Sequence, residues 1–403
     1  MSQDETPKAP QNRREEIAGV AVVVALIIAA IAYFVGYKNA NESIRPIIAA
    51  GNHHSFALDI DGKLYATGTN KEGKLGLGDK IDRDAWTLVP PFSDKNVVAI
   101  AATWMHSLAL DSDGKVYATG ENKYGQLGLG DTKNRDIFTL VSPFSDKKIV
   151  AISAGDDHSL ALDIDGKVYA AGDNGGGQLG LGDKVNRASF ALVSSLEGKK
   201  IAAISASGAH SFALDKFGRL YAAGSNEYGE IGLGDDETDN FQLVSSFKGK
   251  KIVAIAAIRQ SFALDEDGRV YGAGDNYLGQ LSLGENIVFN VFAPVKLFND
   301  KKIAAIAAGD GYLLALDSDG NVSAAGNNEF GQLGLGDDDS YKFQLALSSG
   351  VQNIIAIAAG GSHSLALDSD GKIYATGYSG YGQLGVGDAD NRRVFTPITL
   401  PDR

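Results

Sequence analysis

Histidine is the residue best suited to acid–base chemistry near neutral pH, and this chain of 403 residues contains six. Besides His53, five of them stand at the start of the same repeated string: His54, His106, His158, His210 and His363. A reaction needs one site, so a position that recurs in every copy is more simply a structural hydrogen bond between a strand and its neighbour. A ring of imidazoles around a metal is disfavoured, because two further copies carry Gln260 and Tyr312 there. We predict no catalytic residue and no metal site.

A second repeated motif, DxDG, carries the carboxylates that calcium prefers, as in Asp59-Ile60-Asp61-Gly62. A helix–loop–helix calcium site needs a third acidic ligand and a Glu at position twelve of the loop. Here Lys63 and a strand-like segment follow at once. Asp-Gly also tolerates the positive φ of a tight turn, so DxDG predicts a hairpin turn rather than an ion site.

The glycines of a third motif, GQLGLGD, resemble a phosphate-binding loop, but no Gly-Lys-Ser/Thr and no helix start follow them. We interpret them as turn and close-packing residues. The acidic residue that ends the motif recurs as Asp79, Asp131, Asp183, Asp235, Asp337 and Asp388, with Glu285 in the remaining copy. This repetition indicates a structural carboxylate. The chain has no Cys, which excludes thiolate chemistry, and we expect no cofactor.

The elements that must position these residues form a repeat of 50 to 52 residues in seven copies. Each copy contains an apolar run, the alternating HSLALD string, the alternating KVYAAG string and an aromatic segment such as FTLV, which predict four strands. Four strands in a period near 50 residues are typical of propeller blades. We therefore predict an all-β fold, a seven-bladed β-propeller over residues 43–403. Whether the first and last blades exchange a strand is left open.

The run from Ala154 to Asp183, AGDDHSLALDIDGKVYAAGDNGGGQLGLGD, resembles the regulator of chromosome condensation repeat family. The resemblance covers residues 43–403 and implies a seven-bladed propeller. It also implies uses as varied as guanine nucleotide exchange, ubiquitin ligase modules and secreted inhibitors of β-lactamase. The fold therefore does not choose a function.

A stretch of 21 uncharged residues, 17–37, is long enough to cross a bilayer as a helix, with Tyr33, Phe34 and Tyr37 near its end. A cleaved signal peptide is the alternative, but the stretch is longer than the usual apolar region and lacks a small-x-small site. We predict a tail at 1–16, a transmembrane helix at 17–37 that contacts lipid, and a linker at 38–42.

The charges that flank the predicted helix indicate its orientation, and the net charge of the chain limits its partners. Basic residues before the helix slightly exceed those after it, which favours a cytoplasmic N-terminus and an extracytoplasmic propeller, periplasmic or on the cell surface. A net charge of −13 disfavours nucleic acid, whose phosphates attract clustered Lys and Arg.

Function in a repeat protein lies where the copies differ, and the two positions before each repeat histidine differ most. From these positions and the repeat position itself we predict a partner-binding face: Asn52, His53, Trp104, Met105, Asp156, Asp157, Ile258, Arg259, Asp310 and Tyr312. Trp104 is the sharpest candidate, because Trp and Arg are enriched at interface hot spots. The alternative is that Trp104 lies over its own blade. Trp86 aligns with repeated Phe residues and is predicted to be core.

A second loop, GxNxxGQ, presents aromatic residues and is ranked below the first for binding: Tyr124, Tyr228, Tyr277, Phe330 and Tyr381. The alternative is that these rings pack between blades.

We expect a membrane-anchored interaction module, a scaffold or accessory subunit whose partner is another membrane or envelope protein, and not an enzyme. One alternative is a guanine nucleotide exchange factor, although no repeat contains an insertion like the family's wedge. The other is an extracytoplasmic inhibitor or adhesin.

Overall fold

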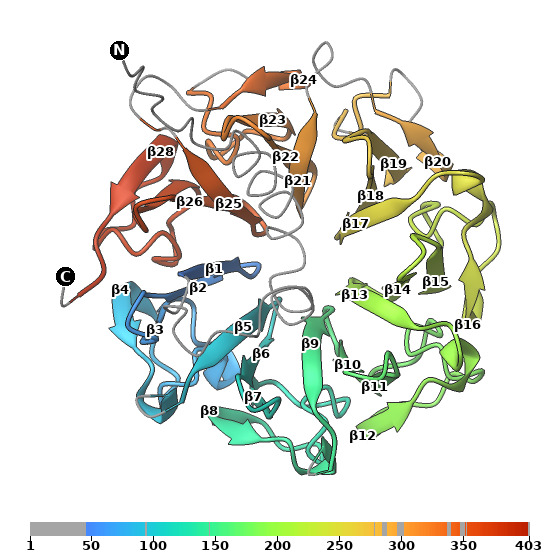
Figure 1. The fold of residues 1–403 in the computed structure, drawn as a ribbon. Coiled ribbons are helices and arrows are strands. Elements are labelled where there is room, and N and C mark those ends of the chain that lie inside the picture. Colours follow the sequence, from blue (N-terminus) through green and yellow to red (C-terminus); the bar gives the residue numbers. More distant parts are fainter. Residues whose placement is uncertain are drawn as a thin grey trace, which may run out of the picture.

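A computed structural model describes residues 46–92, 95–144, 146–277, 279–283, 288–295, 302–336, 340–346, 351 and 353–401. Its strands form seven antiparallel sheets of four, each sheet built from four consecutive strands. Figure 1 shows the sheets around a common axis, with the first strand of each sheet innermost. The predicted all-β propeller of seven four-stranded blades is confirmed.

Blades 1 to 4 contain β1 Ile47–Ala50, β2 His54–Leu58, β3 Leu64–Gly68 and β4 Arg83–Leu88; β5 Val97–Ala102, β6 His106–Asp111, β7 Val116–Gly120 and β8 Arg135–Leu140; β9 Ile149–Ala154, β10 His158–Asp163, β11 Val168–Gly172 and β12 Arg187–Leu192; β13 Ile201–Ser207, β14 His210–Asp215, β15 Leu220–Gly224 and β16 Thr238–Leu243. Blades 5 to 7 contain β17 Ile252–Ala257, β18 Gln260–Asp265, β19 Val270–Asp275 and β20 Val288–Pro294; β21 Ile303–Gly309, β22 Tyr312–Asp317, β23 Val322–Gly326 and β24 Ser340–Leu345; β25 Ile354–Ala359, β26 His363–Asp368, β27 Ile373–Gly377 and β28 Arg392–Ile398. Short 3-10 helices are η1 Lys71–Gly73, η2 Pro90–Phe92, η3 Ser142–Phe144, η4 Ser194–Leu196 and η5 Ser245–Phe247.

The predicted transmembrane segment, residues 17–37, lies outside the described residues, as do the tail and the linker. In the part of the chain that is described, no helix combines the length and the apolar character needed to span a bilayer.

The core is divided among neighbouring blades rather than held within each one. In one cluster, Leu108 and Val116 of blade 2 pack with Tyr169 and Phe190 of blade 3. Both faces of each sheet are therefore covered by other sheets, so a single blade has no complete core of its own.

The ring closes through the same kind of contact. Tyr65 and Trp86 of blade 1 share a cluster with Leu365 and Leu367 of blade 7. Over the described residues, β1 to β4 and β25 to β28 are each complete sheets, so no strand is exchanged between the first and last blades there, which answers the question that the repeat pattern left open.

The GQLGLGD glycines fit the predicted close packing. A Cβ on Gly128 would lie 2.3 Å from Phe190 Cδ2, and one on Gly385 would lie 2.2 Å from Trp86 Nε1. Trp86 is 3% exposed, so its predicted core position is confirmed. The repeat thus places an aromatic ring of one blade over a glycine of the blade before it.

Two faces of the ring follow from the strand order. Within a blade, the loop between the first two strands bonds to the loop after the third strand, for example Glu121 N to Met105 O at 2.9 Å. The turn between the second and third strands bonds to the linker from the previous blade, for example Lys216 N to Lys200 O at 3.1 Å. We call the first surface the long-loop face and the second the short-turn face.

Candidate partner-binding face

The repeat histidines link neighbouring blades through serine. His106 Nε2 lies 2.9 Å from Ser159 Oγ of the next blade, and Ser159 Oγ donates to Gln126 O at 2.7 Å. The hydroxyl has one hydrogen, so its oxygen must accept from Nε2–H, which makes the histidine the neutral Nε2–H tautomer. His363 and Ser55 make the same link across the ring closure, at 2.8 Å.

This geometry excludes base-activated serine chemistry at these pairs. A general base must accept the nucleophile's proton, whereas here Nε2 donates and the serine proton is committed to a carbonyl. Burial lowers the pKa of His106 and His210 to about 4 and, with nearby histidines, that of His158 to about 3. The rings are therefore uncharged near pH 7, and the predicted structural role is confirmed at these positions.

The repeated carboxylates are also occupied. In blade 2, Asp111 Oδ1 accepts from the N–H groups of Asp113 and Lys115, and Oδ2 accepts from the Tyr117 hydroxyl at 3.0 Å. Asp131 Oδ2 pairs with Arg135 at 2.7 Å. These contacts support the hairpin-turn and structural-carboxylate interpretations. Over the described ranges, no group of three or more His, Asp and Glu is arranged to hold a metal ion.

Two blades depart from the histidine position. Gln260 Nε2 donates to Gly309 O at 2.7 Å, and the Tyr312 hydroxyl donates to His363 O at 2.6 Å. Tyr312 is 0% exposed, so its predicted place on the partner-binding face is wrong. Its ring replaces the imidazole inside the ring of blades, where a partner does not reach it.

The sharpest predicted residue, Trp104, lies on the long-loop face and is 45% exposed. Its ring meets His53 of blade 1 edge-on at 6.4 Å between centroids, and His53 in turn lies 5.0 Å from Tyr381 of blade 7. Trp104 therefore leans towards the neighbouring blade rather than over its own. Both predicted loops contribute to this aromatic cluster, so they form one surface and not two.

A buried lysine, Lys74, supports the cluster. Its ammonium donates to the backbone oxygen of Trp104 at 2.7 Å, and the residue is 1% exposed. Burial, with a smaller effect of Lys71, lowers its pKa to about 8. Burial, and to a smaller extent the charge of Lys74, lowers the pKa of His53 to about 4. His53 Nδ1 is buried and has no hydrogen-bond partner among the described residues.

Sequence reasoning missed Lys74, although a signal was present. The other copies have Gln126, Gln178, Glu230, Gln280, Gln332 and Gln383 at its position. The Gln126 side chain accepts the N–H of Tyr124 at 2.9 Å, within its own loop. Gln126 Nε2 also reaches the next blade and donates to Asp157 Oδ1 at 3.3 Å, whereas Lys74 brings a positive charge to the backbone oxygen of Trp104.

Beside Trp104 the face becomes acidic. Trp104, Met105 and Tyr124 line a hollow of about 380 Å³ with Asp156, Asp157, Glu121 and Lys123. Burial first, and then Asp156, Glu121 and Asp173, raise the pKa of Asp157 to about 6. An aromatic wall beside carboxylates that resist ionisation suits a partner with an apolar and a basic group side by side.

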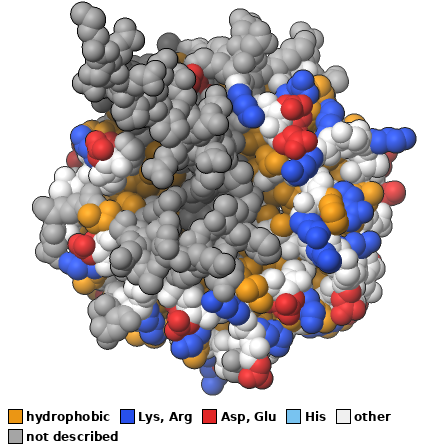
Figure 2. Space-filling view, viewed as in Figure 1, with side chains coloured by type: hydrophobic (Ala, Val, Ile, Leu, Met, Phe, Trp, Pro, Cys, Tyr) orange, Lys and Arg blue, Asp and Glu red, His pale blue; other side chains and the backbone are white. Residues whose placement is uncertain are grey.

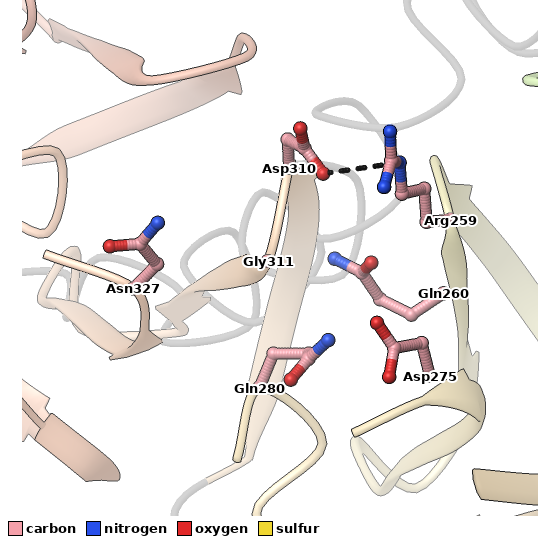
Figure 3. A pocket seen from close by; sticks show the side chains of 7 residues that line it. All are labelled: Arg259, Gln260, Asp275, Gln280, Asp310, Gly311 and Asn327. Atoms are coloured by element: carbon pink, nitrogen blue, oxygen red, sulfur yellow. Dashed lines mark ion pairs between the residues drawn. The ribbon is translucent and has the colours of Figure 1, made fainter. Parts of the chain in front are cut away.

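The predicted residues of blades 5 and 6 line a second, smaller hollow (Figure 3), where Arg259 Nε lies 3.6 Å from Asp310 Oδ1. The two side chains are 67% and 47% exposed. Such an exposed pair contributes little to stability, so both charges stay available to a partner. Asn52 and Ile258 are partly buried on the same face.

The remaining aromatic residues of the second loop differ in exposure. Tyr277 is 76% exposed and Tyr228 48% exposed, whereas Phe330 packs on Tyr378 of the next blade at 4.9 Å. The inter-blade packing alternative therefore holds for Phe330. A partner-binding role for the exposed residues stays a prediction.

Known families and proteins match the propeller part of this chain. The RCC1-like domain matches residues 177–403, and the regulator of chromosome condensation (RCC1) repeat matches residues 61–110 and 113–162. The chain is similar to the ultraviolet-B receptor UVR8 of Arabidopsis thaliana, at 31% identity over 86% of this chain and 80% of the receptor. It is also similar to the E3 ubiquitin-protein ligase HERC2 of Homo sapiens, at 33% identity over 85% of this chain and 7% of the ligase.

Among solved structures, Prp20p of Saccharomyces cerevisiae superposes with a TM-score of 0.68 and 26% identity over 79% of this chain and 81% of that one. Prp20p is described together with its binding to Gsp1p and histones. The chain thus spans most of UVR8 and Prp20p but only a small part of HERC2.

Proposed function

The chain belongs to the regulator of chromosome condensation (RCC1) repeat family, and from that premise we propose that it is a membrane-anchored protein-interaction module. Its partner docks on the long-loop face, at the cluster of Trp104, His53 and Tyr381 and along the adjacent acidic hollow. We propose a membrane or envelope protein as that partner and an extracytoplasmic location for the propeller.

One observation carries the docking proposal: Lys74 uses its buried ammonium to hold the Trp104 loop, and the indole stays half exposed. A large apolar ring kept at the surface has no role in the core of its own blade. Trp is also the residue most enriched at interface hot spots. The repeat histidines are buried between blades, and the repeat carboxylates hold turns or pair with arginine, so the differences between copies are what remains for recognition.

The anchor proposal rests on the uncharged stretch 17–37, which has the length and hydropathy of a bilayer span. Membranes from cells that express the chain would be extracted with carbonate and treated with protease in sealed vesicles of known orientation. Retention in the membrane pellet and cleavage of the propeller only from the extracytoplasmic side support the proposal. Release by carbonate contradicts the anchor, and cleavage from the cytoplasmic side contradicts the orientation.

The docking proposal is tested by cross-linking the full chain in mild detergent and identifying the proteins captured. Trp104→Ala and Arg259→Glu are compared with Leu243→Ala, which truncates a 51% exposed apolar residue on the outer strand β16. A defined partner that is lost with the first two variants and kept with the third supports the proposal. Equal capture by all three would place the binding site elsewhere.

A second candidate is a guanine nucleotide exchange factor, one of the uses that the family resemblance implies. The likeness to Prp20p, which binds Gsp1p, favours it. Release of labelled guanine nucleotide from candidate GTPases, with and without the chain, tests this function directly. If the chain speeds nucleotide release and Trp104→Ala abolishes that effect, nucleotide exchange becomes the better explanation, because the long-loop face would then act on a GTPase.

A further inference from the structure

One turn of the short-turn face differs in chemistry from all the others. Six blades place an acidic residue before the turn glycine: Asp61, Asp113, Asp165, Asp267, Asp319 and Asp370. Blade 4 places Phe217 there, between Lys216 and Arg219 across Gly218, and the phenyl ring is 58% exposed. Lys216 Nζ lies 5.0 Å and Arg219 Cζ 5.3 Å from the ring centroid. An acidic turn has become an aromatic ring bracketed by cations.

The neighbouring linkers add positive charge on both sides of this turn. Lys216 N donates to Lys200 O at 3.1 Å, and a Cβ on Gly218 would lie 2.3 Å from Lys251 Cγ. Lys248 and Lys250 precede Lys251 in the same exposed linker. Lys251 pairs with Glu266 and Arg219 pairs with Asp215. Among the described residues, Lys200, Lys216, Lys248 and Lys250 form no ion pair. We call Lys200, Lys216, Phe217, Arg219, Lys248, Lys250 and Lys251 the cationic patch.

The cationic patch is positively charged, whereas the whole chain has a net charge of −13. Concentrated positive charge on such a chain points to an anionic partner. Figure 2 shows Lys and Arg side chains lying beside Asp and Glu around the edge of one face of the ring, where the charges are largely mixed. The cationic patch differs because it gathers five lysines and one arginine around the one turn without the repeated acidic residue.

The direction of β1 indicates which anionic partner faces the patch. β1 ends at Ala50 in the long-loop face, so the chain enters it at Ile47 from the side of the short-turn face. Residues 38–46 connect the apolar stretch 17–37 to this point, and a chain of that length spans at most about 30 Å when extended. A bilayer that held residues 17–37 would thus lie close to the short-turn face.

Exposed apolar residues on the same face fit a lipid interface. Ile60 in the turn of blade 1 is 52% exposed, and Ile164 in the turn of blade 3 is 42% exposed. Together with Phe217 they are scattered apolar residues on the face that carries the cationic patch, and apolar residues on the same face as basic ones favour binding at the boundary between headgroups and acyl chains.

We propose that the cationic patch binds the surface of an anionic lipid bilayer, with Phe217 at headgroup depth, and that the ring therefore turns its long-loop face away from the membrane. The proposal rests on the anchor proposed above for the identity of the surface. It assigns the two faces different occupants: lipid on the short-turn face and protein on the long-loop face.

The absence of Cys from the chain permits a direct test, because one introduced cysteine can be labelled alone. Phe217→Cys in the full chain carries an environment-sensitive fluorophore. The protein is reconstituted in nanodiscs of phosphatidylcholine alone or of an equal mixture with phosphatidylglycerol, each with a spin-labelled quencher lipid. Asp319→Cys marks the equivalent turn of blade 6, and Tyr277→Cys marks the long-loop face.

The expected result is a blue shift and several-fold quenching of the label at position 217 in the anionic nanodiscs only. The label at position 277 should change little, and the label at position 319, on the same face but outside the cationic patch, should change less than the label at position 217. Equal emission at positions 217 and 277 in both lipids would overturn the proposal. So would a blue shift caused by polyglutamate but not by anionic lipid, since it would identify an acidic protein as the occupant.

If the chain is not membrane-inserted, the anchor proposal fails separately, and the same labelled protein is floated with vesicles of the two compositions. Flotation with the phosphatidylglycerol mixture, and none with phosphatidylcholine, supports the patch without the anchor. No flotation with either vesicle overturns it.

Discussion

The two faces of the ring come from the same repeat but depart from it with different residue types. On the long-loop face the departures are aromatic and acidic, as at Trp104 and Asp157, and a buried Lys74 supports them from below. On the short-turn face the departure is a Phe among lysines at blade 4. One scaffold can thus carry two surfaces of opposite character, because the exposed loop positions that vary between copies lie outside the shared core.

The largest expected effect concerns the ring that both faces share. Burial holds the pKa of the repeat histidines below their usual 6.5, to about 4 for His106 and about 3 for His158. The unfolded chain binds protons first as the pH falls, so stability is full above pH 6.5 and is lost between pH 6.5 and about 4. The loss is up to about 1.4 kcal/mol per pH unit for each histidine.

Urea unfolding at several pH values measures this loss. His158→Gln, which copies the residue of blade 5, should reduce the pH dependence of the free energy of unfolding by the share of one histidine. An unchanged pH dependence would mean that the carboxylates and not the histidines govern acid unfolding. Both faces should lose binding together at low pH, since they depend on one cooperative ring.

Charge reversal on the short-turn face comes next in size. Lys248→Glu combined with Lys250→Glu replaces two attractive charges by repulsive ones, at about 1 kcal/mol for each basic residue near an anionic surface. The lost attraction and the added repulsion together amount to about 4 kcal/mol, so affinity for phosphatidylglycerol vesicles should fall on the order of 1000-fold by flotation. Lys80→Glu with Lys123→Glu, on the long-loop side, is the matched control and should leave flotation unchanged. An equal loss in both variants would show only a general effect of net charge.

Truncation on the long-loop face follows. Trp104→Ala should weaken partner capture about 30-fold, the effect of losing a hot-spot side chain worth about 2 kcal/mol. It should leave vesicle binding and the unfolding midpoint nearly unchanged, because the indole is half exposed. Loss of vesicle binding in this variant would contradict the assignment of separate occupants to the two faces.

The smallest effect is expected at the supporting residue. Lys74→Gln restores the residue type of the other copies and removes the bond to the Trp104 oxygen, so capture should weaken about 5-fold, as for one hydrogen bond of about 1 kcal/mol. Lys71→Gln removes an exposed lysine of the same loop and serves as control. A return to full capture in Lys74→Arg, which keeps the charge and a donor, would confirm that Lys74 acts by positioning Trp104.

Prediction from the sequence succeeded where a residue's role is repeated. The histidine string, the DxDG turn and the Gly-rich loop each recur, so their structural roles could be inferred from repetition alone, and Trp86 could be placed in the core by its register with Phe138. Prediction failed at Tyr312, where an aromatic residue at a variable position was taken as surface. Tyr312 fills the place of the repeat imidazole because its hydroxyl donates to His363 O, a residue 51 positions away in the sequence.

The sequence by itself determined the blade, its four strands, the number of copies and the residues that depart from the repeat, because these depend on local periodicity and turn chemistry. Only the tertiary structure decided what lies between blades: the Nε2–H tautomer set by a serine one blade away, the reach of Lys74 to Trp104, the union of the two loops and the closure of the ring without strand exchange. Those features depend on distances across the ring, and a linear pattern carries no such distances.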